Sequence, residues 1–197
     1  MSTRGAPMSE VKLKSDRFVG LAAGEAAPRK TFWQRLLPFL FKPPQGPGAL
    51  PTMSFQEGCY AVLYGAIMAD DNHGALEQQA LEKKLGNIAV FAEMSADTRD
   101  ALHNAVMGKF HSVDDARRWA VVGVGCDAIR KEEGGDAPGR LARAMFGHAV
   151  DLVNSDNPIN ELELDFIQAL GLRLRLQKLF IAELTAVVEA QWATKKS

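Results

Sequence analysis

From Ser54 to the end of the chain, apolar residues recur every three or four positions, and two-residue alternation does not appear. A period near 3.6 residues is typical of amphipathic helices, whereas alternation is typical of strands. The pattern predicts about seven helices, over residues 54–69, 75–91, 95–110, 112–132, 136–153, 160–171 and from 176 onward. Because the loops between them have roughly two to eight residues, we expect an all-α domain packed as a compact bundle.

Residues that commonly cap helices stand at most of the expected starts. Ser54 and Asn160 are each followed three residues later by Glu, which is the spacing of a capping box. The other expected caps are Ser95 or Asp97 for the third helix, Ser112 for the fourth and Asp136 for the fifth. Gly171 is expected to end the sixth.

A tail of residues 1–48 precedes this helical domain of residues 49–197. Up to Lys30 the tail has no sustained period, and we expect it to be disordered. Residues 31–42 then form a short apolar block that contains Pro38, which would kink or break a helix. Three interpretations stay open: a peripheral contact with a membrane surface, a docking segment for a partner protein, or a segment that packs on the chain's own body. The apolar residues of the block are Phe32, Trp33, Leu36, Leu37, Phe39, Leu40 and Phe41.

Charge divides the chain at the same place. The 197 residues contain 23 Lys and Arg against 24 Asp and Glu, so the formal net charge is −1. Residues 1–48 hold eight basic and three acidic residues, whereas the rest holds fifteen and twenty-one. The chain therefore joins a basic tail to an acidic body. A protein that coats nucleic acid needs a large basic excess, so we expect no nucleic-acid partner.

The two cysteines and the absence of targeting signals indicate a cytoplasmic protein. Cys59 and Cys126 lie far apart and form no Cys-x-x-Cys motif, so we expect two buried thiols on helices. No basic region followed by an apolar run marks a secretory signal. No stretch reaches the roughly 18 consecutive apolar residues that a membrane span needs.

One internal repeat occurs at two expected joints between helices. Asp70 is followed seven residues later by Glu77, and Asp156 is followed seven residues later by Glu163. The two copies are 86 residues apart, and Leu81 and Ile167 stand four positions after each Glu. A sequence repeated at a joint suggests one structural device that is used twice.

Two interpretations of the repeat stay open. A turn that brings Asp, loop carbonyls and a first-turn Glu together supplies the oxygen ligands that Ca²⁺ or Mg²⁺ prefers. The loops are shorter and less acidic than an EF-hand loop. Alternatively, Asp and Asn satisfy backbone groups in turns, and Glu at the third helical position completes a capping box without any metal.

These residues resemble the tellurite-resistance TerB family, whose members are also similar to the N-terminal domain of some membrane-anchored DnaJ-type co-chaperones. The family pattern is an apolar helix that ends in Ala-Asp-Gly, an apolar residue two positions on, and Glu seven after the Asp. Its second copy leads into Leu-Gly-Leu, as Leu170, Gly171 and Leu172 do here. Asp71 and Asn157 replace the usual Gly, and His73 replaces the apolar residue. The similarity covers roughly residues 54–192.

The resemblance implies two helix-loop-helix halves related by a pseudo-twofold axis and an acidic surface that binds a divalent cation. It implies a non-enzymatic role in bacterial stress response, chiefly tellurite resistance, through other Ter-type proteins at the inner membrane. Carried over by position, the metal ligands would be Asp70, Asp71, Glu77, Asp156 and Glu163, with Asn157 as a further candidate.

Other functional patterns are weaker. Residues 123–128, GVGCDA, lack the strand and turn of a dinucleotide loop, so we expect these glycines to let two helices approach. His103, His111 and His148 form no metal-ligand pattern, and we expect hydrogen-bonded or solvated histidines. Two alternatives to the TerB-like function are a metal-dependent hydrolase that uses the same carboxylates and a purely structural adaptor whose acidic joints are only caps.

Overall fold

The computed structural model describes residues 50–69, 75–113, 117–134, 139–155 and 159–195. Within these ranges the regular structure is helical and strands are absent, which confirms the expected all-α class. The tail of residues 1–48, including the apolar block 31–42, lies outside the described residues. The helices are α3 (Phe55–Ile67), α4 (Ala75–Asn87), α5 (Ala89–Ala92), α6 (Ala96–His111), α7 (Arg118–Glu132), α8 (Arg140–Val153), α9 (Glu161–Arg173) and α10 (Lys178–Lys195).

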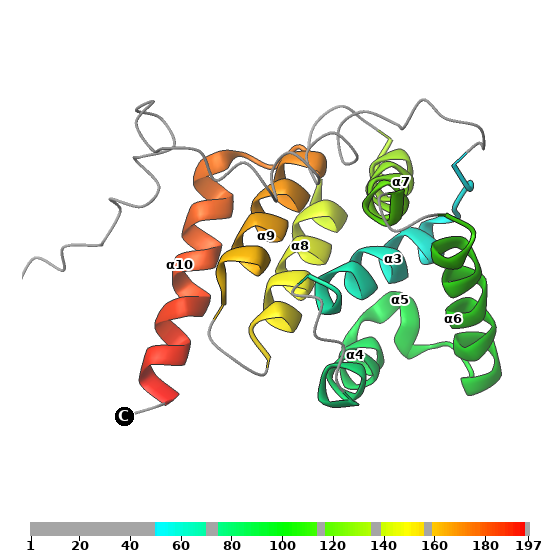
Figure 1. Ribbon diagram of the computed structural model, residues 1–197, viewed down its shortest axis with the longest axis horizontal. Coiled ribbons are helices and arrows are strands. Elements are labelled where there is room, and N and C mark those ends of the chain that lie inside the picture. The colour runs from blue at the N-terminus through cyan, green and yellow to red at the C-terminus, as the bar shows by residue number, and fades with distance from the viewer. Residues whose placement is uncertain (1–49, 70–74, 114–116, 135–138, 156–158, 196–197) are drawn as a thin grey trace, which may run out of the picture.

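Helix α3 lies at the centre of this bundle and packs against α4, α6, α7, α8 and α9 (Figure 1). It begins with the expected capping box, because Ser54 Oγ accepts the Glu57 N–H and Glu57 Oε2 accepts the Ser54 N–H. From Gly58 to Met68 every residue except Tyr64 is buried. A helix with neighbours on all sides needs apolar residues all round rather than on a single face.

The closest approach to α3 is made by α7, through two glycines. A Cβ added at Gly58 would lie 2.7 Å from the Gly125 carbonyl oxygen, and one added at Gly125 would lie 2.9 Å from the Gly58 carbonyl oxygen. The two backbones are therefore in contact where the helices cross. This geometry confirms that a glycine of the 123–128 segment lets two helices approach.

The internal repeat is a repeat of helix boundaries as well as of sequence. Ile67 and Val153 end α3 and α8, and α4 and α9 have the same length and both begin and end 86 residues apart. The two pairs contact each other reciprocally, since α3 packs on α8 while α4 contacts α8 and α9 contacts α3. Reciprocal contacts are what a pseudo-twofold axis between two helix pairs requires. Leu81 and Ile167, which correspond in the two copies, are both buried in the core.

Three helix boundaries differ from the expected ones. The helix expected over 75–91 is divided at Ile88, whose extended backbone lets both Ile88 and Phe91 enter the core. Ser112 does not open α7; it is the C-cap of α6, and its hydroxyl donates to the Lys109 carbonyl. Gly171 does not end α9 but lies within its last turn, so close to α10 that an added Cβ would be 2.5 Å from Ile181 Cδ1.

The start of α8 is capped from the end of α7. Glu133 Oε1 accepts the N–H groups of Leu141 and Ala142, and Oε2 accepts the N–H of Gly139. Gly139 is the N-cap and carries no side chain that could serve. The expected cap, Asp136, lies outside the described residues. A carboxylate suits this position because it also complements the positive end of the helix dipole.

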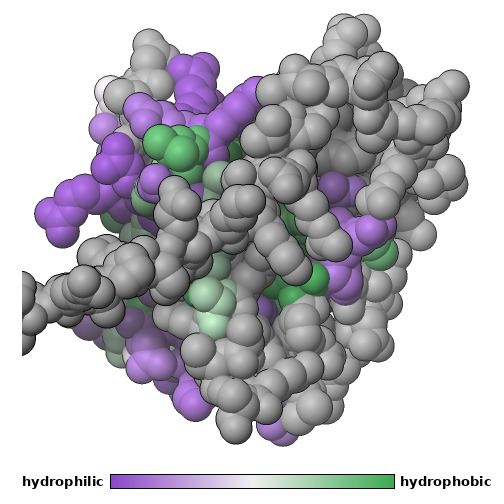
Figure 2. Space-filling model, turned by 90° about the vertical axis from the view of Figure 1, so that its left-hand side faces the viewer, coloured by the Kyte–Doolittle hydropathy of each residue, from purple (hydrophilic) through white to green (hydrophobic). Residues whose placement is uncertain are grey.

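On the side of the molecule where α10 lies, described hydrophobic residues form separate green patches between hydrophilic, purple ones (Figure 2). Leu179 and Val187 of α10 are among the exposed apolar residues. None of the described helices combines the length and the hydropathy needed to cross a membrane.

Replacement of Gly58 by Ala is expected to destabilise the fold by about 1–3 kcal/mol, because the new methyl group overlaps the α7 backbone. The matched control is Gly108→Ala on α6, where an added Cβ meets nothing within 4 Å. That variant should gain up to about 1 kcal/mol from helix propensity alone. Urea unfolding of both variants measures the difference, and a stabilised Gly58→Ala protein would contradict the tight crossing.

The Glu57 carboxylate also pairs with Lys109 and so joins the start of α3 to the end of α6. Burial by itself would raise the pKa of Glu57, but hydrogen bonds from Lys109 and Ser54 and the charge of Lys109 outweigh it and lower that pKa below 4.5. A lowered folded-state pKa stabilises the fold above the unfolded-state pKa, and the stabilisation is lost as the pH falls through the folded-state pKa.

We therefore expect Lys109→Gln to lower the free energy of unfolding by about 0.5–1 kcal/mol at pH 7. The difference from wild type should shrink as the pH falls from 4.5 through the lowered folded-state pKa of Glu57. Lys131→Gln, at an exposed position on α7, removes the same charge and serves as the control. Urea unfolding between pH 3 and pH 7 is the measurement; a Lys109→Gln effect that does not change with pH would refute this role of the ion pair.

Candidate functional site

The second acidic joint is described from Ile159 onward, and its Glu163 is part of a complete capping box. Asn160 Oδ1 accepts the N–H groups of Leu162 at 2.9 Å and Glu163 at 3.0 Å. Glu163 Oε2 accepts the Asn160 N–H at 2.7 Å. The Glu163 side chain is buried, with 4% of the residue exposed. Carboxylates are rarely so buried unless they are bonded, and here the helix end supplies a bond.

The first joint places Glu77 at the third residue of α4, which corresponds to Glu163 at the third residue of α9. The side chain of Glu77 and the residues Asp70, Asp71, Asp156 and Asn157 lie outside what the structure describes. Among the side chains that it does describe, no three His, Cys, Asp or Glu residues lie close enough together to hold a metal ion.

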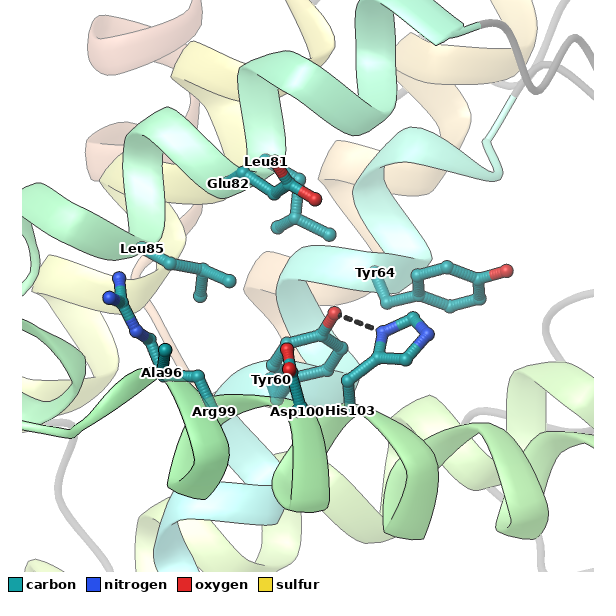
Figure 3. Close-up of a pocket in the computed structure, with 9 residues that line it drawn as sticks. All are labelled: Tyr60, Tyr64, Leu81, Glu82, Leu85, Ala96, Arg99, Asp100 and His103. Carbon is teal, nitrogen blue, oxygen red and sulfur yellow. Dashed lines mark hydrogen bonds between the residues drawn. The ribbon is translucent and has the colours of Figure 1, made fainter.

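A cavity of about 330 Å³ lies elsewhere, between α3, α4 and α6, and we call it the α3–α4–α6 cavity (Figure 3). Helix α3 contributes two tyrosines to its lining, and α4 contributes two leucines and a glutamate. Helix α6 contributes an alanine, an arginine, an aspartate and a histidine. The lining residues are Tyr60, Tyr64, Leu81, Glu82, Leu85, Ala96, Arg99, Asp100 and His103. Because three helices contribute, the packing around α3 creates the cavity.

A hydrogen bond between Tyr60 and His103 crosses one side of the cavity. The Tyr60 hydroxyl oxygen and His103 Nδ1 are 2.6 Å apart, and the rings meet edge to face at 5.8 Å. Tyr60 also contacts Phe91 edge to face, with ring centroids 6.4 Å apart. These contacts hold both side chains, and Figure 3 shows the hydroxyl pointing to the histidine ring.

Acidic neighbours give this part of the cavity a negative potential. Burial raises the pKa of Tyr60 to about 12, and Tyr64, Glu82 and Asp100 add to the effect. The phenol is therefore neutral at pH 7, and its O–H can donate to Nδ1 of a histidine whose proton is on Nε2. Glu82 and Asp100 are exposed at the rim, whereas Tyr60 and Leu81 are buried below them.

Sequence reasoning missed this cavity. The expectation of a hydrogen-bonded or solvated histidine holds for His103, but its partner lies 43 residues earlier in the chain. The available signal was the pair Tyr60 and Tyr64, which are four residues apart and lie on one face of a helix. That signal gives no indication of which helix packs opposite.

Both cysteines are buried and free, as expected. Burial raises the pKa of Cys59 and of Cys126 to about 12. The thiolate is the reactive form of cysteine, so neither thiol is suited to nucleophilic or redox chemistry in the folded protein.

The chain was compared with protein-family models, with curated proteins and with solved structures, and none of the three comparisons gives a significant match. The similarity to the TerB family accordingly stays a prediction from the motifs.

The alkaline pH dependence of stability tests the environment of Tyr60. Its pKa is raised from 10 to about 12 in the fold, so its contribution is complete below pH 10 and is lost as the pH rises through 12. Wild type should therefore lose up to about 1.4 kcal/mol per pH unit above pH 10 from this group. Tyr60→Phe should lack that loss, at a cost of about 1 kcal/mol at pH 7 for the missing hydrogen bond. Urea unfolding at pH 8–11 gives the dependence of the free energy of unfolding on pH for both proteins. The same dependence in wild type and Tyr60→Phe would contradict a buried phenol.

Proposed function

We propose that this chain is a non-enzymatic, TerB-like protein that binds a divalent cation at its two acidic joints and acts through partner proteins in stress response. The observation that carries the proposal is the repeat of helix boundaries at the 86-residue offset, with Glu77 and Glu163 at the same position of their helices. Two helix pairs with matching boundaries and the same acids in their sequences suggest one ligand-binding device used twice.

The chemistry of the proposed ligands favours Ca²⁺ or Mg²⁺. The set consists of carboxylate and amide oxygens from Asp70, Asp71, Glu77, Asp156, Asn157 and Glu163. Hard cations prefer such oxygens. Glu163 is oriented by its bond to the Asn160 N–H. A ligand oriented by a helix cap loses little conformational freedom when it binds metal.

The partners are proposed from the resemblance and from the tail. Other Ter-type stress proteins are the first candidates. The apolar block of residues 31–42, with basic residues around it, would provide a peripheral contact with the inner membrane or with such a partner in the bacterial cytoplasm.

A second candidate is a purely structural adaptor, and the complete capping box at Asn160 and Glu163 favours it. On this alternative the acidic joints only terminate and begin helices. The wild-type protein would then respond to no divalent cation.

Thermal and urea unfolding with and without Ca²⁺ or Mg²⁺ distinguishes the two candidates. At a hundred times its dissociation constant, a bound cation should add about 2.7 kcal/mol to the free energy of unfolding. Asp156→Asn combined with Glu163→Gln should abolish this gain while it keeps the cap, because Gln also completes a capping box. Glu161→Gln combined with Glu183→Gln removes the same charge from exposed positions and should keep the gain. A wild-type protein whose stability no divalent cation changes would refute metal binding.

A further inference from the structure

The α3–α4–α6 cavity combines an apolar floor with a charged rim. Leu81, Leu85 and Tyr60 are buried and form the floor, while Glu82 and Asp100 are exposed at the rim. Binding sites for small molecules commonly have this composition, in which apolar walls supply contact area and a few polar groups fix orientation. The ring of Tyr60 is already held by Phe91 and His103, so the floor is formed before any ligand enters.

The charges of the rim favour a positively charged ligand near Tyr60 and His103. Glu82 on α4 and Asp100 on α6 both contribute negative potential at the Tyr60 hydroxyl. Arg99 supplies the positive charge of the lining, and Figure 3 shows it pointing away from the Tyr60–His103 pair, past Leu85. The negative potential is therefore concentrated at one end of the cavity.

The described side chains of this cavity do not form a metal-binding group. Glu82, Asp100 and His103 all have described side chains, yet they do not come close enough together to form a metal-binding group. An ammonium group on an organic body suits this lining, because it donates three hydrogen bonds and is attracted by carboxylates and by the faces of tyrosine rings.

We propose that the α3–α4–α6 cavity is a binding site for a small organic amine, with its ammonium group between Glu82 and Asp100 and its apolar body on Leu81, Leu85 and Tyr60. His103 positions the Tyr60 ring through their hydrogen bond. Glu163 of the second joint is not part of the cavity lining.

The test is a calorimetric and NMR titration of the full chain with phenethylamine, an amine that carries an aromatic body. Backbone amide shifts should change on α3, α4 and α6 and stay constant on α9 and α10. The neutral isostere 2-phenylethanol should bind about tenfold more weakly, because it lacks the charge that the two carboxylates recognise. The anion phenylacetate should bind more weakly still. Equal affinity for amine and alcohol, or shifts centred on α9 or α10, would overturn the proposal.

Substitutions at the rim test whether its carboxylates contribute to amine binding. Glu82→Gln and Asp100→Asn change exposed side chains and should each weaken phenethylamine binding about two- to fivefold without changing the fold. Glu183→Gln, which removes one exposed carboxylate from α10, is the charge-matched control and should leave the affinity unchanged. Arg99→Gln should not weaken binding, since it removes a positive charge. If the double variant Glu82→Gln with Asp100→Asn binds phenethylamine as tightly as wild type, the carboxylates do not form the site.

Discussion

The contact between the backbones of Gly58 and Gly125 is the constraint on which the rest of the bundle depends. It lets α7 lie directly against α3, where a single side chain on either glycine would push the helices apart. With α7 this close, α3 can be enclosed by α4, α6, α8 and α9 as well. Most of the apolar surface of α3 is then removed from water, which is the main favourable contribution to folding. The same central helix carries Tyr60 to the cavity and leads into the first acidic joint.

Around this centre, the chain uses one helix pair twice. The pairs α3–α4 and α8–α9 share their boundaries at a fixed offset, and their reciprocal contacts make each pair part of the other's core. The two pairs differ in the helices that follow them in the chain. After α9 the backbone turns through Arg175, which has a positive φ of 59°, and α10 packs on the outer side. After α4 the chain turns at Ile88 into α5 and α6, and α6 supplies one wall of the cavity.

The sequence was sufficient to predict the starts of α3, α6 and α9, where the caps are local. Ser54, Ser95 and Asn160 each bond to the backbone two or three residues ahead, so the pattern and the structure agree. Two other boundaries could not be predicted because their cause is tertiary. Glu133 caps a helix that begins seven residues later, and Ile88 leaves the helical conformation so that it can enter the core. Periodicity cannot reveal such events, because the local residues are compatible with a continued helix.

The same distinction between local and tertiary contacts applies to the candidate sites. It explains why the acidic joints could be recognised in the sequence and the cavity could not. The joints are local repeats, whereas Tyr60 and His103 become neighbours only because α6 crosses α3. A local motif of this kind does not identify its function, because Glu at the third helical position can either complete a cap or bind a cation. Glu163 illustrates the overlap: one oxygen binds the Asn160 N–H, and this bond fixes the carboxylate as firmly for metal as for the helix. A helix cap and a cation site would therefore use the same residues of the joint. Only a measured response to a cation distinguishes the two roles.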